Sequence, residues 1–159
     1  MIVLRCTRKL LDRLGTAVDG PGKSSALLGD WYAKPFPVAQ RRFVLLMSAS
    51  TRVPVVMSAR DLANLTRNFP DALAAVLGRL RLSPPAVERE VAASREVVLA
   101  TTDSRSMLGS LNDFAWHAQQ RLRDEPSLDL VDLSVSLAHM PVIAMDFGFP
   151  RDAAARVLG

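Results

Sequence analysis

The chain has 159 residues, of which 49% are hydrophobic and 23% charged, and its formal net charge is +4. This length suits a single domain, residues 1–159, that buries about two-thirds of its unfolded surface without disulfides. The lone cysteine excludes an internal disulfide framework and is typical of a reducing compartment. Arginines interrupt the first apolar run, which excludes a signal peptide or a membrane span there, so we expect a cytoplasmic protein with no membrane partner.

Charge is distributed unevenly along the chain. Residues 1–67 contain 11 Lys or Arg against 4 Asp or Glu, a balance of +7, whereas residues 68–159 contain 9 against 12, a balance of −3. A basic half favours an acidic partner, either nucleic acid or an acidic protein surface. The alternative is an ordinary solvated face, because the basic residues are scattered rather than gathered in one block. The residues expected to bind such a partner are Arg5, Arg8, Lys9, Arg41 and Arg42.

The first quarter of the chain predicts a strand, a helix, a loop and an aromatic turn, in that order. Residues 2–6 are an apolar run typical of a strand, and residues 8–14 have the apolar spacing of a short helix. Residues 16–25 contain glycine and proline without any periodicity, which predicts an exposed loop whose flexibility is left open. We interpret residues 27–36 as an aromatic turn covering the core, with a ligand pocket as the alternative.

Two apolar segments in the middle of the chain predict a hairpin. Residues 42–48 are almost wholly apolar, as in a buried strand, and residues 53–58 return as its partner. Because Pro54 cannot donate a ladder hydrogen bond, this second strand should lie at a sheet edge. A homodimer through that edge stays open, although the proline and nearby arginines disfavour it. Residues 96–102, rich in β-branched side chains, predict one more strand.

Helices are expected between and after these strands. Residues 62–80 have a helical apolar stripe that Pro70 should break, and a further helix begins at Ser83 and runs to about Arg95. Ser127 is expected to cap another helix, and a small one ends the chain. The resulting prediction is an α+β fold, with a small, mostly antiparallel sheet of about four strands, a central hairpin, and five to seven packed helices.

The stretch 101–123 combines polar side chains with apolar anchors. Ser110 precedes Asp113 by three residues, a capping box that predicts a helix beginning near Leu111. Gly109 and the serine-containing connection before it would gather backbone N–H groups at an anion-binding corner. The alternative is that these polar side chains only hold the connection in place, as they usually do near helix starts.

Two function classes therefore remain. The first is a non-catalytic module that binds nucleic acid or an acidic protein through the basic half. The second is a small enzyme with its site where the GDWYA turn meets the SRSMLGSLNDF corner, which requires Asp30 and Arg105 to share a cleft. Whether the chain is an enzyme is left open. The candidate catalytic residues are Asp30, Arg105, Ser106 and Asn112, with Tyr32 as a further one.

Metal and cofactor chemistry have no recognisable signature in the sequence. Cys6, His117 and His139 are isolated, and no pair of them has the spacing of metal ligands. A cysteine–histidine nucleophile pair is equally unspecified, since Cys6 ends an apolar strand where a buried, inert thiol is usual. We expect no metal site and no cofactor.

Three blocks occur in order along the chain: LRCTRKLLDRLG at 4–15, LGDWYA at 28–33 and SRSMLGSLNDF at 104–114. In these blocks the chain resembles a bacterial family of uncharacterised proteins, a domain of unknown function with the pattern LRCTxKLL, LGDWYAN and SRSxLGSMNDF. Lys34 stands where that family has Asn, and Leu111 where it has Met. The resemblance covers nearly the whole chain and implies a single domain, but it supplies no substrate, cofactor or catalytic residue.

Overall fold

The computed structural model describes all residues from Met1 to Gly159 and contains one five-stranded sheet with six α-helices. The strands are β1 (Ile2–Cys6), β2 (Trp31–Val38), β3 (Arg41–Ser48), β4 (Pro54–Ser58) and β5 (Val97–Thr101). The helices are α1 (Arg8–Leu14), α2 (Leu65–Arg79), α3 (Pro84–Ala93), α4 (Arg105–Asp124), α5 (Leu130–Ala138) and α6 (Pro150–Leu158), with the short 3-10 helices η1 (Leu62–Asn64) and η2 (Ile143–Met145). The predicted α+β class is confirmed.

The sheet has the strand order β4-β3-β2-β1-β5 and two kinds of pairing. β1 is parallel to both of its neighbours, β2 and β5, whereas β2, β3 and β4 form an antiparallel meander. The hairpin of β3 and β4 is confirmed, with Phe43 opposite Ser58. β4 lies at the sheet edge, the position that its first residue, Pro54, requires.

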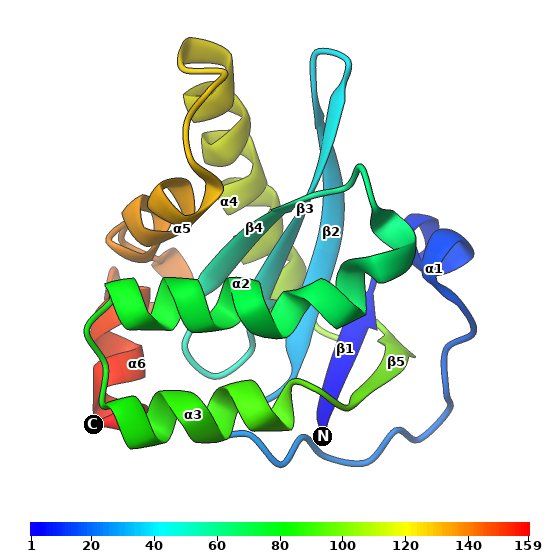
Figure 1. Cartoon of the computed structure of the whole chain (residues 1–159), viewed down its shortest axis with the longest axis vertical. Coiled ribbons are helices and arrows are strands. Elements are labelled where there is room, and N and C mark those ends of the chain that lie inside the picture. The colour runs from blue at the N-terminus through cyan, green and yellow to red at the C-terminus, as the bar shows by residue number, and fades with distance from the viewer.

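Helices cover both faces of the sheet, and alternation along the strands divides the side chains between them. Ile2, Leu4 and Cys6 of β1 belong to an apolar core shared with α1, α2, α3 and α6. A second core, which includes Phe114 of α4, lies on the opposite face. In Figure 1, α2 and α3 lie in front of the sheet and α4 behind it. Arg5 therefore points toward the α4 side, away from its apolar neighbours in β1.

The aromatic turn predicted for residues 27–36 is largely a strand. Gly29, with φ of 75°, makes the turn, and β2 then begins at Trp31. Trp31 is fully buried and packs edge-on against Phe69, with ring centroids 5.0 Å apart. β1 pairs with β2 only as far as Ala33, so the rest of β2 has one open edge that tolerates its two prolines.

Three helix boundaries differ from the prediction. α4 begins at Arg105 rather than near Leu111, because the Ser104 hydroxyl caps it by accepting from the Met107 amide at 3.2 Å. α5 is capped by Asp129 and not by Ser127; its carboxylate accepts two backbone N–H groups. α2 continues through Pro70 to Arg79, since burial of its apolar stripe outweighs the one backbone hydrogen bond that a proline lacks.

Residues 16–25 contain no helix or strand. The Val18 amide donates to the Leu99 carbonyl at 2.8 Å, and the Ser25 amide donates to the Met1 carbonyl at 2.9 Å. These two bonds attach the segment to the open side of β5 and to the start of β1. No helix of the chain combines the length and the hydropathy needed to cross a membrane.

Candidate functional site

A small pocket lies between α1 and the β2–β3 hairpin. Its volume is about 140 Å³, and much of its wall is apolar, including Leu10, Phe36 and Leu62. The cations Lys9, Arg13 and Arg42 complete the lining, which contains no Asp or Glu. The pocket therefore joins an apolar wall to positive charge.

A second pocket, of about 430 Å³, adjoins the first and shares Arg42 and Ala59 with it. It adds Arg41 and Arg60, and again no Asp or Glu lines it. We call the five cations around these two pockets the basic face. Its members are Lys9, Arg13, Arg41, Arg42 and Arg60.

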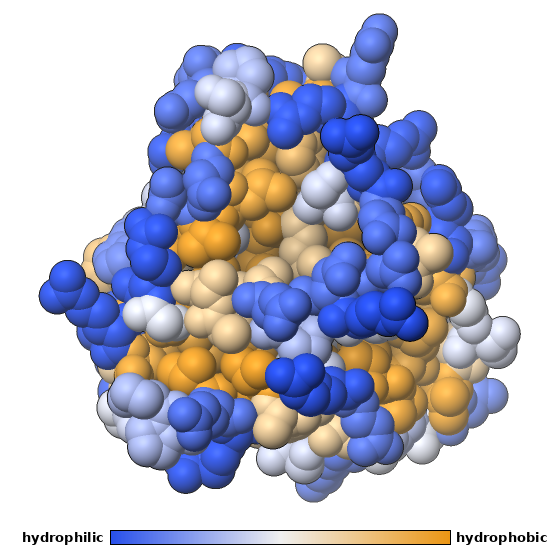
Figure 2. Space-filling view, viewed as in Figure 1, coloured by the Kyte–Doolittle hydropathy of each residue, from blue (hydrophilic) through white to orange (hydrophobic).

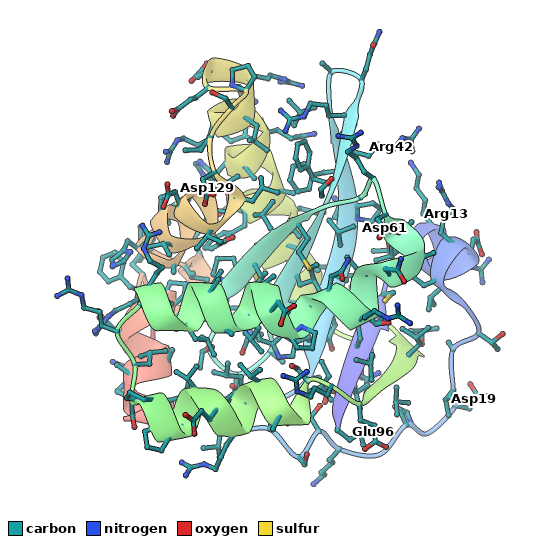
Figure 3. All side chains as sticks on the ribbon, in the orientation of Figure 1. Arg13, Asp19, Arg42, Asp61, Glu96 and Asp129 are labelled. Carbon is teal, nitrogen blue, oxygen red and sulfur yellow. The ribbon has the colours of Figure 1, made fainter.

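Local structure explains why these cations converge. Lys9 and Arg13 are four residues apart, so they lie one above the other on α1, while Leu10 turns into the core. The chain leaves β4 beside the start of β3, where the Ala59 amide donates to the Arg42 carbonyl at 2.9 Å. That bond brings Arg60 next to Arg42. In Figure 3 the labels for Arg13, Arg42 and Asp61 lie together near α1 and η1.

None of the five cations of the basic face forms an ion pair, and all five are exposed. Arg41 alone makes a polar contact: its guanidinium donates to the Pro126 carbonyl at 2.5 Å and lies 4.8 Å from the centre of the Phe43 ring. The nearby carboxylate of Asp61 accepts from the Asn64 amide instead. In Figure 2, the side where the hairpin and α1 lie is covered largely by hydrophilic residues.

Arg5 has entirely different surroundings. Its Nε donates to Asp30 Oδ2 at 2.9 Å, and its Nη1 donates to the Thr101 carbonyl at 3.0 Å and lies 3.4 Å from Asp103 Oδ2. Asp30 also accepts from the Ser24 hydroxyl at 2.7 Å, and Asp103 accepts from the Tyr32 hydroxyl. We call Arg5, Asp30, Tyr32 and Asp103 the ion-pair cluster. Arg5 is therefore not part of the basic face.

Burial and charge shift two pKa values within the ion-pair cluster. Burial lowers the pKa of Arg5, but its bonds to the two carboxylates outweigh this, so the net shift is upward. Burial and the hydrogen bond to Asp103 both raise the pKa of Tyr32 well above its ordinary value. The guanidinium thus stays charged and the phenol stays neutral, as a stable structural network requires.

Arg8 also lies apart from the basic face. It lines a third pocket, of about 620 Å³, where β1 and β5 end. Asp12 lines the same pocket, so the local charge is mixed. Of the residues predicted to bind an acidic partner, Lys9, Arg41 and Arg42 lie together, whereas Arg5 and Arg8 do not.

The candidate catalytic residues contact different partners and form no hydrogen-bonded group with one another. Asp30 belongs to the ion-pair cluster, Ser106 accepts from Arg52 at 3.1 Å, and Asn112 accepts from Lys34. Arg105 is exposed and makes no side-chain hydrogen bond. The Tyr32–Asp103 and Lys34–Asn112 contacts join the two sequence blocks, but no hydrogen bond or ion pair connects Asp30 to Arg105, Ser106 or Asn112.

The remaining nucleophile and metal candidates stay separate. Burial raises the pKa of the Cys6 thiol to about 12, so it is protonated at neutral pH. No three His, Cys, Asp or Glu side chains gather in an arrangement that could hold a metal ion. His117 lies 3.6 Å from Asp113 on the surface of α4, and His139 contacts only the Val135 carbonyl.

Sequence reasoning missed Arg13 and Arg60. Arg13 had a signal, since it follows Lys9 by four residues in a helix that was predicted correctly. Arg60 had none, because its place beside Arg42 depends on how β4 pairs with β3.

Comparisons with known proteins identify a family and no individual relative. The family model described as domain of unknown function DUF6933 matches residues 3–153. No curated protein and no solved structure matches the chain. The matched residues begin at the second residue of β1, include the other four strands and extend into α6, so they contain both the basic face and the ion-pair cluster. The chain therefore belongs to the DUF6933 family.

Proposed function

We propose that the chain is a non-catalytic binding module that holds nucleic acid against its basic face. The observation that carries this proposal is the charge at the two adjoining pockets: five exposed cations line them, and no Asp or Glu does. Like charges gathered around adjoining pockets repel one another, and a bound polyanion would lessen that repulsion.

Of the 15 other lysines and arginines, only Arg5, Arg79 and Arg151 have a carboxylate within 4 Å, at 2.9, 2.7 and 3.7 Å. Most cations therefore lack an ion pair, and the basic face differs by gathering five such cations around two adjoining pockets. Phosphates would supply the missing partners, and the counterions that they release on binding would add affinity that depends on salt.

Two features favour nucleic acid over an acidic protein. Four of the five cations are arginines, whose planar guanidinium group binds a phosphate through two parallel hydrogen bonds. The β2–β3 hairpin projects beyond the body of the molecule beside them (Figure 1). A projecting two-stranded ribbon fits a nucleic-acid groove, and flanking arginines would then lie near the phosphates.

Fluorescence anisotropy with labelled single- and double-stranded DNA and RNA tests this proposal, at about 50 mM and about 200 mM salt. The decisive variant is the triple substitution Lys9→Ala, Arg13→Ala and Arg42→Ala. Its affinity should fall at least about 100-fold. The plot of log affinity against log salt should become less steep, by the amount that corresponds to the loss of about three phosphate contacts.

The matched control removes three other positive charges. Arg89, Arg123 and Arg156 lie on α3, α4 and α6, are exposed, and make no side-chain hydrogen bond. Their triple alanine variant has the same net charge as the first one, so it should retain nearly all of the affinity. Equal loss in both variants, or no binding at low salt, would contradict the proposal. Binding to polyglutamate alone, weakened by the first variant only, would indicate an acidic protein partner.

A further inference from the structure

Arg52, in the turn between β3 and β4, is a partly buried cation with no carboxylate partner. Its Nη1 donates to the Ala49 carbonyl at 2.5 Å, its Nε to Ser110 Oγ at 3.3 Å, and its Nη2 to Ser106 Oγ at 3.1 Å. Burial lowers the pKa of Arg52, and its backbone adopts the left-handed region with φ of 62°. The turn thus holds an unneutralised guanidinium group against the first turns of α4.

The two serines that contact Arg52 have unused donors. Each accepts a hydrogen bond from Arg52, and neither hydroxyl donates to any acceptor in the protein. Serines in α5 behave differently: Ser134 and Ser136 donate to carbonyls of their own helix at 2.7 and 2.8 Å. Ser110 is only 7% exposed, and a buried donor without an acceptor is unfavourable.

These hydroxyl groups line a pocket of about 360 Å³ between α4 and the segment around η2. Ser106 and Ser110 line the α4 side, and Asp113 follows Ser110 by three residues on the same helix. Arg52 does not line the pocket and contacts it only through the two serine oxygens. The facing wall is apolar and consists of Val142, Ile143 and Ala144. The lining thus combines two hydrogen-bond donors, a carboxylate and an apolar surface.

The charge of this lining decides the class of ligand. A phosphate dianion would meet the Asp113 carboxylate, and a simple ammonium ion would offer no acceptor to the two serine hydroxyls. A zwitterion satisfies both groups, since residues three apart on a helix are separated by about 5–6 Å. The only ion-pair partner of Asp113 is His117, whose Nε2 lies 3.6 Å away, so the carboxylate retains capacity for an ammonium group.

We propose that this pocket binds an amino acid with an apolar side chain. The ligand carboxylate accepts from Ser106 and Ser110, its ammonium group faces Asp113, and its side chain packs on Val142, Ile143 and Ala144. This site is separate from the basic face and does not depend on nucleic-acid binding.

Isothermal titration calorimetry of the full chain with the common amino acids, each at up to about 10 mM, tests the proposal. We expect leucine or a similar apolar amino acid to bind. Leucinamide, which lacks the carboxylate, and 4-methylpentanoate, which lacks the ammonium group, should each bind at least about 10-fold more weakly. Equal binding of 4-methylpentanoate, or no binding of any amino acid, would overturn the proposal.

Gly109 provides a variant that blocks the pocket without disturbing the fold. It lines the pocket, lies within α4, and has no atom within 4 Å of the place where a Cβ would stand. Gly109→Leu should abolish amino-acid binding while the helix gains propensity. Gly78→Leu in α2, where the added Cβ also meets open space, is the matched control and should bind normally.

Two milder variants test the contacts of the ligand carboxylate and of its ammonium group one at a time. Ser110→Ala should weaken leucine at least about 10-fold and leave leucinamide unchanged, because leucinamide lacks the carboxylate that Ser110 binds. Asp113→Asn should weaken leucine and leave 4-methylpentanoate unchanged. Leucine binding that survives Gly109→Leu would place the ligand elsewhere and overturn the assignment.

Discussion

Two groups of residues in the N-terminal half, the ion-pair cluster and the basic face, hold their cations in opposite surroundings. In the ion-pair cluster, Arg5 has two carboxylates, a carbonyl and 14% side-chain exposure. In the basic face, Arg42 lies among four other cations and makes no side-chain hydrogen bond. The same side chain therefore stabilises the fold in one place and is free for a partner in the other. Net charge alone does not distinguish these roles.

The largest effect should come from removing Arg5. Arg5→Ala leaves Asp30, 23% exposed in its side chain, without its cation, so the free energy of unfolding should fall by about 2 kcal/mol. Urea denaturation measures this. Asp30→Ala in the same background should cost much less than it does alone. Nucleic-acid affinity should stay unchanged. A loss of affinity as large as that of Arg42→Ala would mean that Arg5 also contributes to nucleic-acid binding.

The second-largest effect should come from alkaline pH, which should lower the free energy of unfolding through Tyr32 of the ion-pair cluster. The pKa of Tyr32 is raised in the folded chain, so above about pH 10 the unfolded state loses its proton first and stability falls as pH rises, by up to about 1.4 kcal/mol per unit. Cys6, with its pKa raised to about 12, acts in the same direction from about pH 9.

Tyr32→Phe in a Cys6→Ala background isolates the phenol. Between about pH 8 and about pH 11, its unfolding free energy should decline less steeply than that of Cys6→Ala alone. Identical slopes would show that Tyr32 titrates normally in the folded chain.

Arg42→Ala should produce a smaller effect, and on nucleic-acid affinity rather than on stability. Affinity for nucleic acid should fall about 5- to 10-fold and the salt slope should decrease by about one contact. Its unfolding free energy should change by less than about 0.5 kcal/mol, because the side chain is exposed and has no partner. A drop in stability without a change in affinity would show that Arg42 stabilises the fold and does not bind nucleic acid.

The smallest effect is expected for Arg79→Ala, which tests how much an ion pair stabilises the fold when it is exposed rather than partly buried. Its Nη2 lies 2.7 Å from Asp132 Oδ1, but the two side chains are 57% and 46% exposed. Arg79→Ala should therefore lower the free energy of unfolding by less than about 1 kcal/mol and leave affinity unchanged. Thermal and urea denaturation beside Arg5→Ala make the comparison direct. An equal cost in both would show that burial contributes nothing to the ion-pair cluster.

Part of the candidate site could be predicted from the sequence. Lys9, Arg41 and Arg42 were chosen on charge alone, and all three line the basic face. Arg5 was chosen on the same grounds and lies in the ion-pair cluster, because Asp30 and Asp103 are 25 and 98 positions away from it along the chain. Local patterns carry no information about partners at such separations.

The sequence by itself determined the elements whose physics is local. The apolar run of β1, the turn into α1, and the edge position of β4 follow from side-chain spacing and from the missing N–H of Pro54. Tertiary structure alone decided that Trp31–Val38 is a strand, that Arg5 faces α4, and that Arg60 lies beside Arg42. Each of these depends on which backbone pairs with which, and that choice is made by the burial of the whole sheet between two layers of helices.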